Sequence, residues 1–213
     1  MFSRFKSTAR QLAEGIARIL HKTGVSPTQL TLIGFLLNLA VGVVLALGYL
    51  PLGGGLLLVV GAFDMLDGAL ARVANRATTF GAFLDSTLDR ISEAALLLGL
   101  LIEASRHGDQ IVPPLAFIVI VGSLMVSYTR ARAEGLGLKN EVGIAPRPER
   151  VVILGVGLIV GLEIPALAVL AVLTYVTVIQ RILNVQQLLR GSGRDPEPPR
   201  RPASQTESRL ETR

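Results

Sequence analysis

Cysteine is absent from the 213-residue sequence, and histidine occurs only twice. Without cysteine the chain can form no disulfide, no thiolate nucleophile and no cysteine-ligated zinc or iron–sulfur site. His21 and His107 lie beside Lys22 and Arg106 in polar segments, so solvent exposure explains them better than metal ligation. Carboxylates and arginines are therefore the main candidates for chemistry.

Charged residues are also scarce in this sequence. They make up 17% of it, while hydrophobic residues make up 50%, and the mean hydropathy is +0.54. This composition is typical of a membrane protein, and the length allows about six spans of roughly 20 residues each. Membrane topology explains the net charge of +5, so we expect no nucleic-acid partner.

Apolar segments separated by polar turns predict an all-α integral membrane protein with six transmembrane helices. The predicted spans are residues 30–50, 56–73, 80–104, 115–134, 151–162 and 167–183. Turns are predicted at residues 51–55, 75–78, 105–112 and 163–165, with a longer loop at 135–148.

Two flanking segments differ from this six-helix domain, which we place at residues 26–189. Residues 1–25 have apolar residues at helical spacing between lysines and arginines, which predicts an interfacial amphipathic helix. Residues 190–213 are rich in proline, arginine, serine and glutamate, which predicts a disordered tail. Basic residues gather in both flanking segments and near residues 72–78 and 130–150, so the positive-inside rule places both termini in the cytoplasm.

Four aspartates, Asp64, Asp67, Asp85 and Asp89, interrupt the second and third predicted spans. Each would cost roughly 3 kcal/mol at membrane depth, and divalent cations are hard acids that bind several carboxylate oxygens. The first two are spaced i,i+3 and the last two i,i+4, which places each pair on one helix face. An antiparallel pair of these helices would bring the four carboxylates around two Mg²⁺ ions, or alternatively Mn²⁺. Two metals about 3.5–4 Å apart form the usual clamp for displacement at phosphorus.

Small residues lie beside these aspartates. Gly68 follows Asp67, and Gly81 lies one turn before Asp85. Glycine costs a helix about 1 kcal/mol relative to alanine, so its use here indicates either close approach of a ligand or close helix packing. Arg72 lies one turn after Gly68, where it could pair with a carboxylate or hold a phosphate.

The complete string D-x₂-D-G-x₂-A-R-x₈-G-x₃-D-x₃-D runs without a gap from Asp64 to Asp89. It resembles the signature of the CDP-alcohol phosphotransferase family, an integral-membrane fold of six helices with cytoplasmic termini. The resemblance implies transfer of a substituted phosphate from a CDP-linked lipid to an alcohol, with release of CMP. It also implies a homodimer in the plasma membrane, with several spans and an active site toward the cytoplasm.

Carried over to this sequence, the resemblance assigns a role to each matching residue. The metal ligands would be Asp64, Asp67, Asp85 and Asp89. Asp89 would also be the catalytic general base for the attacking hydroxyl. The CDP-binding residues would be Thr31, Asp64, Asp67, Gly68, Arg72 and Gly81.

A second polar group lies at the end of the fourth predicted span, in the following loop and in the sixth span. Its arginines, which include Arg147 at the end of the loop, suit a phosphorylated acceptor, although the positive-inside rule also predicts arginines at cytoplasmic helix ends. The segments SYTRARAEGLGLK and RPERVVIL resemble the phosphatidylinositol phosphate synthase branch of the family. By that resemblance the acceptor phosphate would be bound by Ser127, Arg130, Arg132, Arg150 and Arg181.

The implied reaction is transfer of the phosphatidyl group from CDP-diacylglycerol to inositol phosphate, a phosphorylated polyol, within a bilayer of membrane lipids. A phosphatidylglycerophosphate synthase is the alternative, because glycerol 3-phosphate would suit the same arginines. A cation-coupled transporter also places carboxylates at membrane depth. The sequence has no internal repeat and no helix-breaking proline in the acidic spans, which argues against transport.

Overall fold

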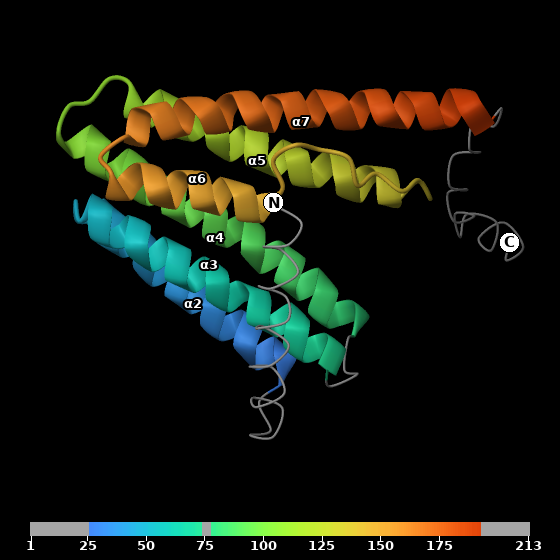
Figure 1. The fold of residues 1–213 in the computed structure, drawn as a ribbon, viewed down its shortest axis with the longest axis horizontal. Coiled ribbons are helices and arrows are strands. Elements are labelled where there is room, and N and C mark those ends of the chain that lie inside the picture. The colour runs from blue at the N-terminus through green and yellow to red at the C-terminus, as the bar shows by residue number, and fades with distance from the viewer. Residues whose placement is uncertain (1–25, 74–77, 193–213) are drawn as a thin grey trace, which may run out of the picture.

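The computed structural model describes residues 26–73 and 78–192, and it describes their side chains except at 65–73 and 191–192. The described residues form six helices and no strand (Figure 1). The helices are α2 (Pro27–Ala46), α3 (Leu50–Val73), α4 (Thr79–Arg106), α5 (Val112–Glu134), α6 (Arg147–Ile159) and α7 (Glu163–Ser192). The predicted all-α fold is confirmed. The predicted amphipathic helix at 1–25 and the predicted tail beyond residue 192 lie outside the described residues.

Local sequence explains where two of the helices begin. The Ser26 hydroxyl accepts a hydrogen bond from the Gln29 N–H at 3.2 Å, and the Gln29 side chain accepts one from the Ser26 N–H at 2.9 Å. This capping box, with Pro27 in the first turn, starts α2. The Thr78 hydroxyl caps α4 by accepting from the Gly81 N–H at 2.9 Å.

The predicted turn at residues 51–55 is wrong. α3 begins at Leu50, Pro51 lies in its first turn, and the glycines that follow are helical. Proline is tolerated there because the first N–H groups of a helix have no partner within it. Gly54 packs against α6, where an added Cβ would come within 2.7 Å of a backbone carbonyl oxygen. These glycines therefore serve helix packing, and the turn lies instead around Gly48, whose φ is 90°.

The last two helices also differ from the predicted spans. α6 begins at Arg147, before the predicted start, and α7 begins at Glu163, where a turn was predicted. Pro165 lies in the first turn of α7, where its missing N–H costs no helical hydrogen bond. The chain turns instead around Gly161, whose φ is 70°.

The helices form two groups, which are joined by α6 and by the packing of α5 on α4. α2 packs against both α3 and α4, whereas α5 packs against α4 and α7. The short helix α6 packs against α3 on one side and α7 on the other, and Figure 1 shows it between the two groups. α3 and α4 run in opposite directions, as predicted (Figure 1), and both contribute aspartates to one cavity. Among the described residues α2 packs against both of them, and no direct packing of α3 on α4 is seen.

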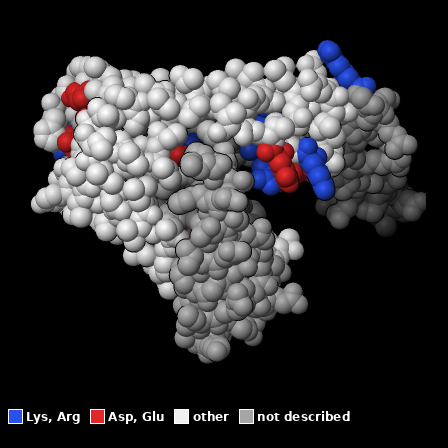
Figure 2. All heavy atoms as spheres, viewed as in Figure 1, with Lys and Arg blue, Asp and Glu red and all other residues white. Residues whose placement is uncertain are grey.

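The outer surface of the described helices is strongly apolar. Val59, Phe117 and Val172 are all more than 60% exposed, and charged side chains gather in only a few places on the face shown in Figure 2. Among the described residues, three helical segments are long and apolar enough to cross a membrane. They are α2, α5 and residues Glu163–Arg190 of α7. This is the surface expected of a protein surrounded by lipid.

Candidate active site

Three of the four predicted aspartates meet at one small cavity. Asp64 comes from α3, and Asp85 and Asp89 come from α4. α2 contributes Thr31 and Asn38 to the same wall. The other lining residues are Phe35, Leu88 and Ser92. The structure thus brings together residues from three helices that are far apart in the sequence.

Asp64 is fixed in place by α2. A Cβ added at Gly34 would come 2.6 Å from Asp64 Oδ1, so glycine lets the backbone of α2 approach the carboxylate closely. The buried Asn38, one turn along, donates to Asp64 Oδ2 at 3.1 Å and to the Gly34 carbonyl oxygen at 3.0 Å. This hydrogen bond partly offsets the cost of removing Asp64 from water.

The remaining predicted residues of the metal and CDP sites lie on the same helices. Asp67, Gly68 and Arg72 follow Asp64 on α3. Their side chains lie outside the described set, so their roles remain predictions. Gly81 lies in the first turn of α4, one turn before Asp85, and its N–H takes part in the helix cap.

An arginine lies between two of the aspartates. Arg147, the first residue of α6, places Nη1 2.6 Å from Asp89 Oδ1 and Nη2 3.2 Å from Asp64 Oδ2. All three side chains are partly buried. The double ion pair therefore compensates two carboxylates that would otherwise repel each other, and it ties α6 to α3 and α4.

The donor set of this cavity fits a hard divalent cation. Three carboxylates line it, and the described lining contains no sulfur or imidazole ligand. Among the side chains that the structure describes, no three acidic or histidine residues converge closely enough to hold one ion, and Asp67 lies outside that set. Mg²⁺ usually needs only one or two protein carboxylates when substrate phosphates complete its shell. Arg147 already places positive charge where a metal would supply it.

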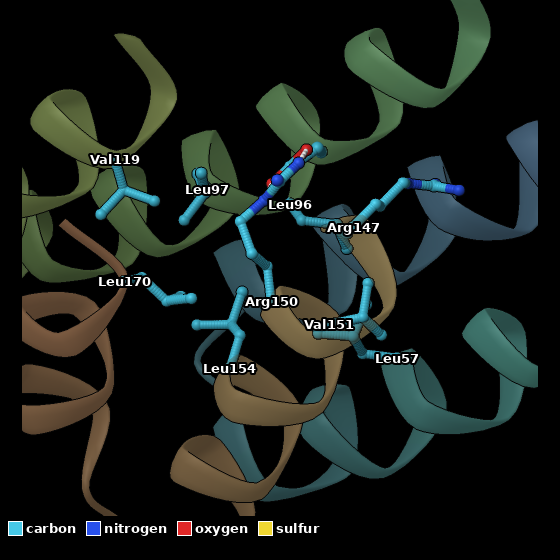
Figure 3. Close-up of a pocket in the computed structure, with 10 residues that line it drawn as sticks. Leu57, Leu96, Leu97, Val119, Arg147, Arg150, Val151, Leu154 and Leu170 are labelled. Carbon is cyan, nitrogen blue, oxygen red and sulfur yellow. Dashed lines mark hydrogen bonds and ion pairs between the residues drawn. The ribbon is translucent and has the colours of Figure 1, made fainter. Parts of the chain in front are cut away.

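Arg150, a predicted acceptor residue, is buried in a cavity between the helix groups. It forms a bidentate ion pair with Glu93 of α4, with Nε–Oε1 and Nη2–Oε2 distances of 2.7 and 2.8 Å. Its Nη1 donates to the Ala145 carbonyl oxygen at 2.8 Å. Figure 3 shows Arg150 among leucines and Arg147 pointing in a different direction from the same helix. Arg150 thus links α6 to α4 and to the preceding loop.

Arg181 of α7 is also buried and binds backbone carbonyl groups. Its Nε donates to the Val142 carbonyl oxygen at 2.9 Å, and its Nη1 donates to that of Val126. The charge of Arg181 interacts with those of Arg130 and Arg150. The other predicted acceptor residues are half-buried Ser127 and exposed Arg130 and Arg132. The structure therefore brings at least three of the five residues into one positively charged region across α5, α6 and α7.

Sequence reasoning missed two polar residues of this region, Asn38 and Glu93, and it grouped Arg147 with the arginines of the acceptor side rather than with the aspartates that it contacts. Asn38 and Glu93 interrupt apolar helical sequence as the aspartates do. The free-energy cost of placing polar residues at membrane depth could therefore have identified them too. Arg147 pairs with Asp64 at a separation of 83 positions, and no local pattern specifies such a contact.

Residues 24–186 match the family described as CDP-alcohol phosphatidyltransferase. The chain belongs to this family of enzymes, as the aspartate signature predicts.

Individual relatives match most of the chain. It is 38% identical over 191 residues to the archaetidylinositol phosphate synthase of Pyrococcus horikoshii, a match that covers 89% of this chain and 98% of the relative. The fold is similar to that of the phosphatidylinositol phosphate synthase of Mycobacterium tuberculosis with CDP-DAG bound. That match has a TM-score of 0.76 and 34% identity, and it covers 82% of this chain and 94% of the other. The same enzyme in complex with manganese and citrate matches with the same TM-score and identity, covering 82% and 88%.

Proposed function

We propose that this protein transfers the phosphatidyl group of CDP-diacylglycerol to a hydroxyl of inositol phosphate, forming phosphatidylinositol phosphate and releasing CMP. The observation that carries the proposal is the convergence of Asp64, Asp85 and Asp89 on one cavity. The names of the archaeal and mycobacterial relatives support the inositol phosphate acceptor, and the bound CDP-DAG of the latter supports the donor.

The acidic cavity would hold the metal and the diphosphate. The proposed metal ligands, for two Mg²⁺ or Mn²⁺ ions, are Asp64, Asp67, Asp85 and Asp89. Bound divalent metal would neutralise negative charge on the diphosphate oxygens, and the manganese complex of the relative supports metal dependence. The proposed CDP contacts beyond these aspartates are Thr31, Gly68, Arg72 and Gly81. Asn38 contributes by orienting Asp64.

Asp89 would accept the proton of the attacking hydroxyl. The new bond forms between the acceptor oxygen and the phosphorus that carries the lipid, and the bond from that phosphorus to the CMP oxygen breaks. The proton passes to an Asp89 oxygen, and CMP leaves with the electron pair of the broken bond. Asp89 Oδ1 contacts Arg147 at 2.6 Å in this structure, and this positive charge disfavours protonation of the carboxylate until Arg147 moves away.

The positively charged region would bind the phosphate of the acceptor. Ser127, Arg130, Arg132, Arg150 and Arg181 are the proposed ligands. Glu93 holds the plane of the Arg150 guanidinium with two hydrogen bonds, and the Ala145 carbonyl oxygen accepts a third. Two of the five N–H groups of Arg150 are left for the acceptor phosphate. Binding the acceptor by its own phosphate would orient its hydroxyl toward the lipid phosphate.

The proposed setting is the plasma membrane. All six described helices would cross it. The more apolar helices α2, α5 and α7 would shield α3, α4 and α6 from lipid. Both termini and the active site would face the cytoplasm, and the protein would be a homodimer.

CMP release by the purified protein tests the proposed function. CDP-diacylglycerol and Mg²⁺ would be supplied with inositol phosphate, free inositol or glycerol 3-phosphate, and an Asp89→Asn variant would be assayed in parallel. We expect release only with inositol phosphate, and a loss of at least about 100-fold in the variant. Release only with glycerol 3-phosphate would overturn the acceptor, whereas no release under any condition would overturn the reaction.

A further inference from the structure

Arg147 binds two of the carboxylates that the proposed function assigns to the metal. It contacts Asp89 at 2.6 Å and Asp64 at 3.2 Å, and it does so from α6, whereas the aspartates lie on α4 and α3. Nothing in the family resemblance assigns Arg147 a role. The inference below rests on the proposed function, because it concerns the proposed metal ligands.

A guanidinium and a divalent cation would compete for these carboxylate oxygens. Without either cation, Asp64 and Asp89 would carry like charges beside Asp85 in a partly buried cavity, and such charges repel. Arg147 relieves that repulsion while no metal is bound. When metal is bound, the same guanidinium adds unfavourable positive charge next to it.

Arg147 is also less fully hydrogen-bonded than its neighbour Arg150. The Nε of Arg147 is buried and has no hydrogen-bond partner among the described residues. Arg150, by contrast, uses Nε, Nη1 and Nη2 in bonds of 2.7 to 2.8 Å. Displacing Arg147 breaks its two ion-pair contacts. It also releases a buried N–H donor that has no partner in the present position, so the displacement costs less than two contacts would suggest.

We infer that Arg147 is a resident counter-cation, which a divalent metal displaces from Asp64 and Asp89 and which thereby sets the metal affinity of the site. It positions the two carboxylates while the metal is absent. It leaves them when the metal binds. This role differs from a structural ion pair, which would persist with metal bound and whose loss would weaken metal binding.

Binding of Mn²⁺ alone to the full-length protein in detergent tests this inference. Free Mn²⁺ is measured by electron paramagnetic resonance for the wild type, Arg147→Gln and Arg147→Lys, with Arg190→Gln as the control. Arg190 is exposed near the end of α7, so its substitution removes the same charge away from the site. We expect Arg147→Gln to bind Mn²⁺ roughly tenfold more tightly, with Arg147→Lys and Arg190→Gln within about twofold of wild type.

The outcomes separate this inference from the proposed function. Unchanged or weaker Mn²⁺ binding by folded Arg147→Gln would overturn the role of Arg147 and leave the metal site intact. Absence of Mn²⁺ binding by the wild type would instead overturn the metal site of the proposed function. In EDTA, Arg147→Gln should have a lower Tm than wild type, and Mn²⁺ should raise that Tm by more than it raises the wild-type value.

A measurement on the wild type alone remains decisive if Arg147→Gln does not fold. Phenylglyoxal modifies accessible arginines, and mass spectrometry measures the rate at each site. Displacement by metal predicts that Mn²⁺ increases the modification rate of Arg147 several-fold and leaves that of Arg190 unchanged. An Arg147 rate that is unchanged or lower with Mn²⁺ would overturn the inference.

Discussion

A buried ion pair joins two helices of this protein. Arg150 of α6 binds Glu93 of α4 with both side chains largely buried, whereas Arg130 and Glu134 form an exposed i,i+4 pair within α5. Removing one partner of a buried pair leaves an uncompensated charge away from water. An exposed pair contributes less than about 1 kcal/mol because water solvates each partner alone. The two pairs should therefore respond differently to the same chemical change.

Glu93→Gln should lower the free energy of unfolding by about 3 kcal/mol, because it leaves the Arg150 charge buried without its carboxylate. Unfolding in detergent, followed by circular dichroism, measures this change. Glu134→Gln is the matched control and should cost less than about 1 kcal/mol. Equal losses in the two variants would show that the Glu93–Arg150 pair is no more important to stability than a surface pair.

The approach of α2 to Asp64 depends on the absence of a single methyl group. Gly34→Ala would place Cβ 2.6 Å from Asp64 Oδ1, which must move the carboxylate away from Asn38. Misplacement of a catalytic group by about 1 Å can cost roughly 100-fold in rate, so we expect a loss of this order in CMP release. Gly55→Ala is the control, because an added Cβ there meets no atom within 4 Å. Wild-type activity in Gly34→Ala would contradict the expected displacement.

α2 and α4 cross at a contact between glycines. A Cβ at Gly42 would come 2.9 Å from the Ala95 carbonyl oxygen, and one at Gly99 would collide with the Gly42 carbonyl oxygen. Both positions are buried. This close crossing holds together the two helices that carry Asn38 and the Asp85–Asp89 pair, so the packing of these elements also shapes the cavity.

Gly99→Ala should separate α2 from α4 and lower the free energy of unfolding by about 2 kcal/mol, since backbone atoms cannot rotate away from the added methyl group. The same substitution at Gly55 should stabilise α3 by up to about 1 kcal/mol, because alanine is the better helix former. Thermal unfolding of both variants in detergent measures the difference. A Gly99→Ala variant as stable as Gly55→Ala would show that the crossing can relax.

The sequence predicts helices more reliably than it predicts their partners. Ser26 and Pro27 identify the start of α2 because capping is local chemistry. The glycines after Pro51 predict a turn by local rules, because the α6 backbone that packs beside them comes from about 100 residues later in the chain. The free-energy cost of placing four aspartates in lipid predicts that they share a site. Arg147 reaches that site only through the tertiary packing of α6. Local rules thus identify the acidic residues but not the helix that completes their surroundings.

The distribution of charge over the whole molecule distinguishes its two sides. The ends of α4 and α5 that flank residues 107–111 carry one arginine, Arg106, whereas the ends of α5 and α6 that flank residues 135–146 carry four. The positive-inside rule predicts that the arginine-rich side faces the cytoplasm. The acidic cavity contacts Arg147 on that same side, so topology and the location of the active site are tested together.

Single cysteines report this topology directly, because the natural sequence contains none. His107→Cys and Lys139→Cys substitute exposed residues in the two connections. In intact cells, a membrane-impermeant maleimide should label His107→Cys but label Lys139→Cys only after the membrane is permeabilised. Wild-type protein controls for background labelling. Labelling of Lys139→Cys in intact cells would place the loop before α6 outside the cell, and with it the cavity formed by Arg147 and the aspartates, where cytoplasmic substrates could not reach it.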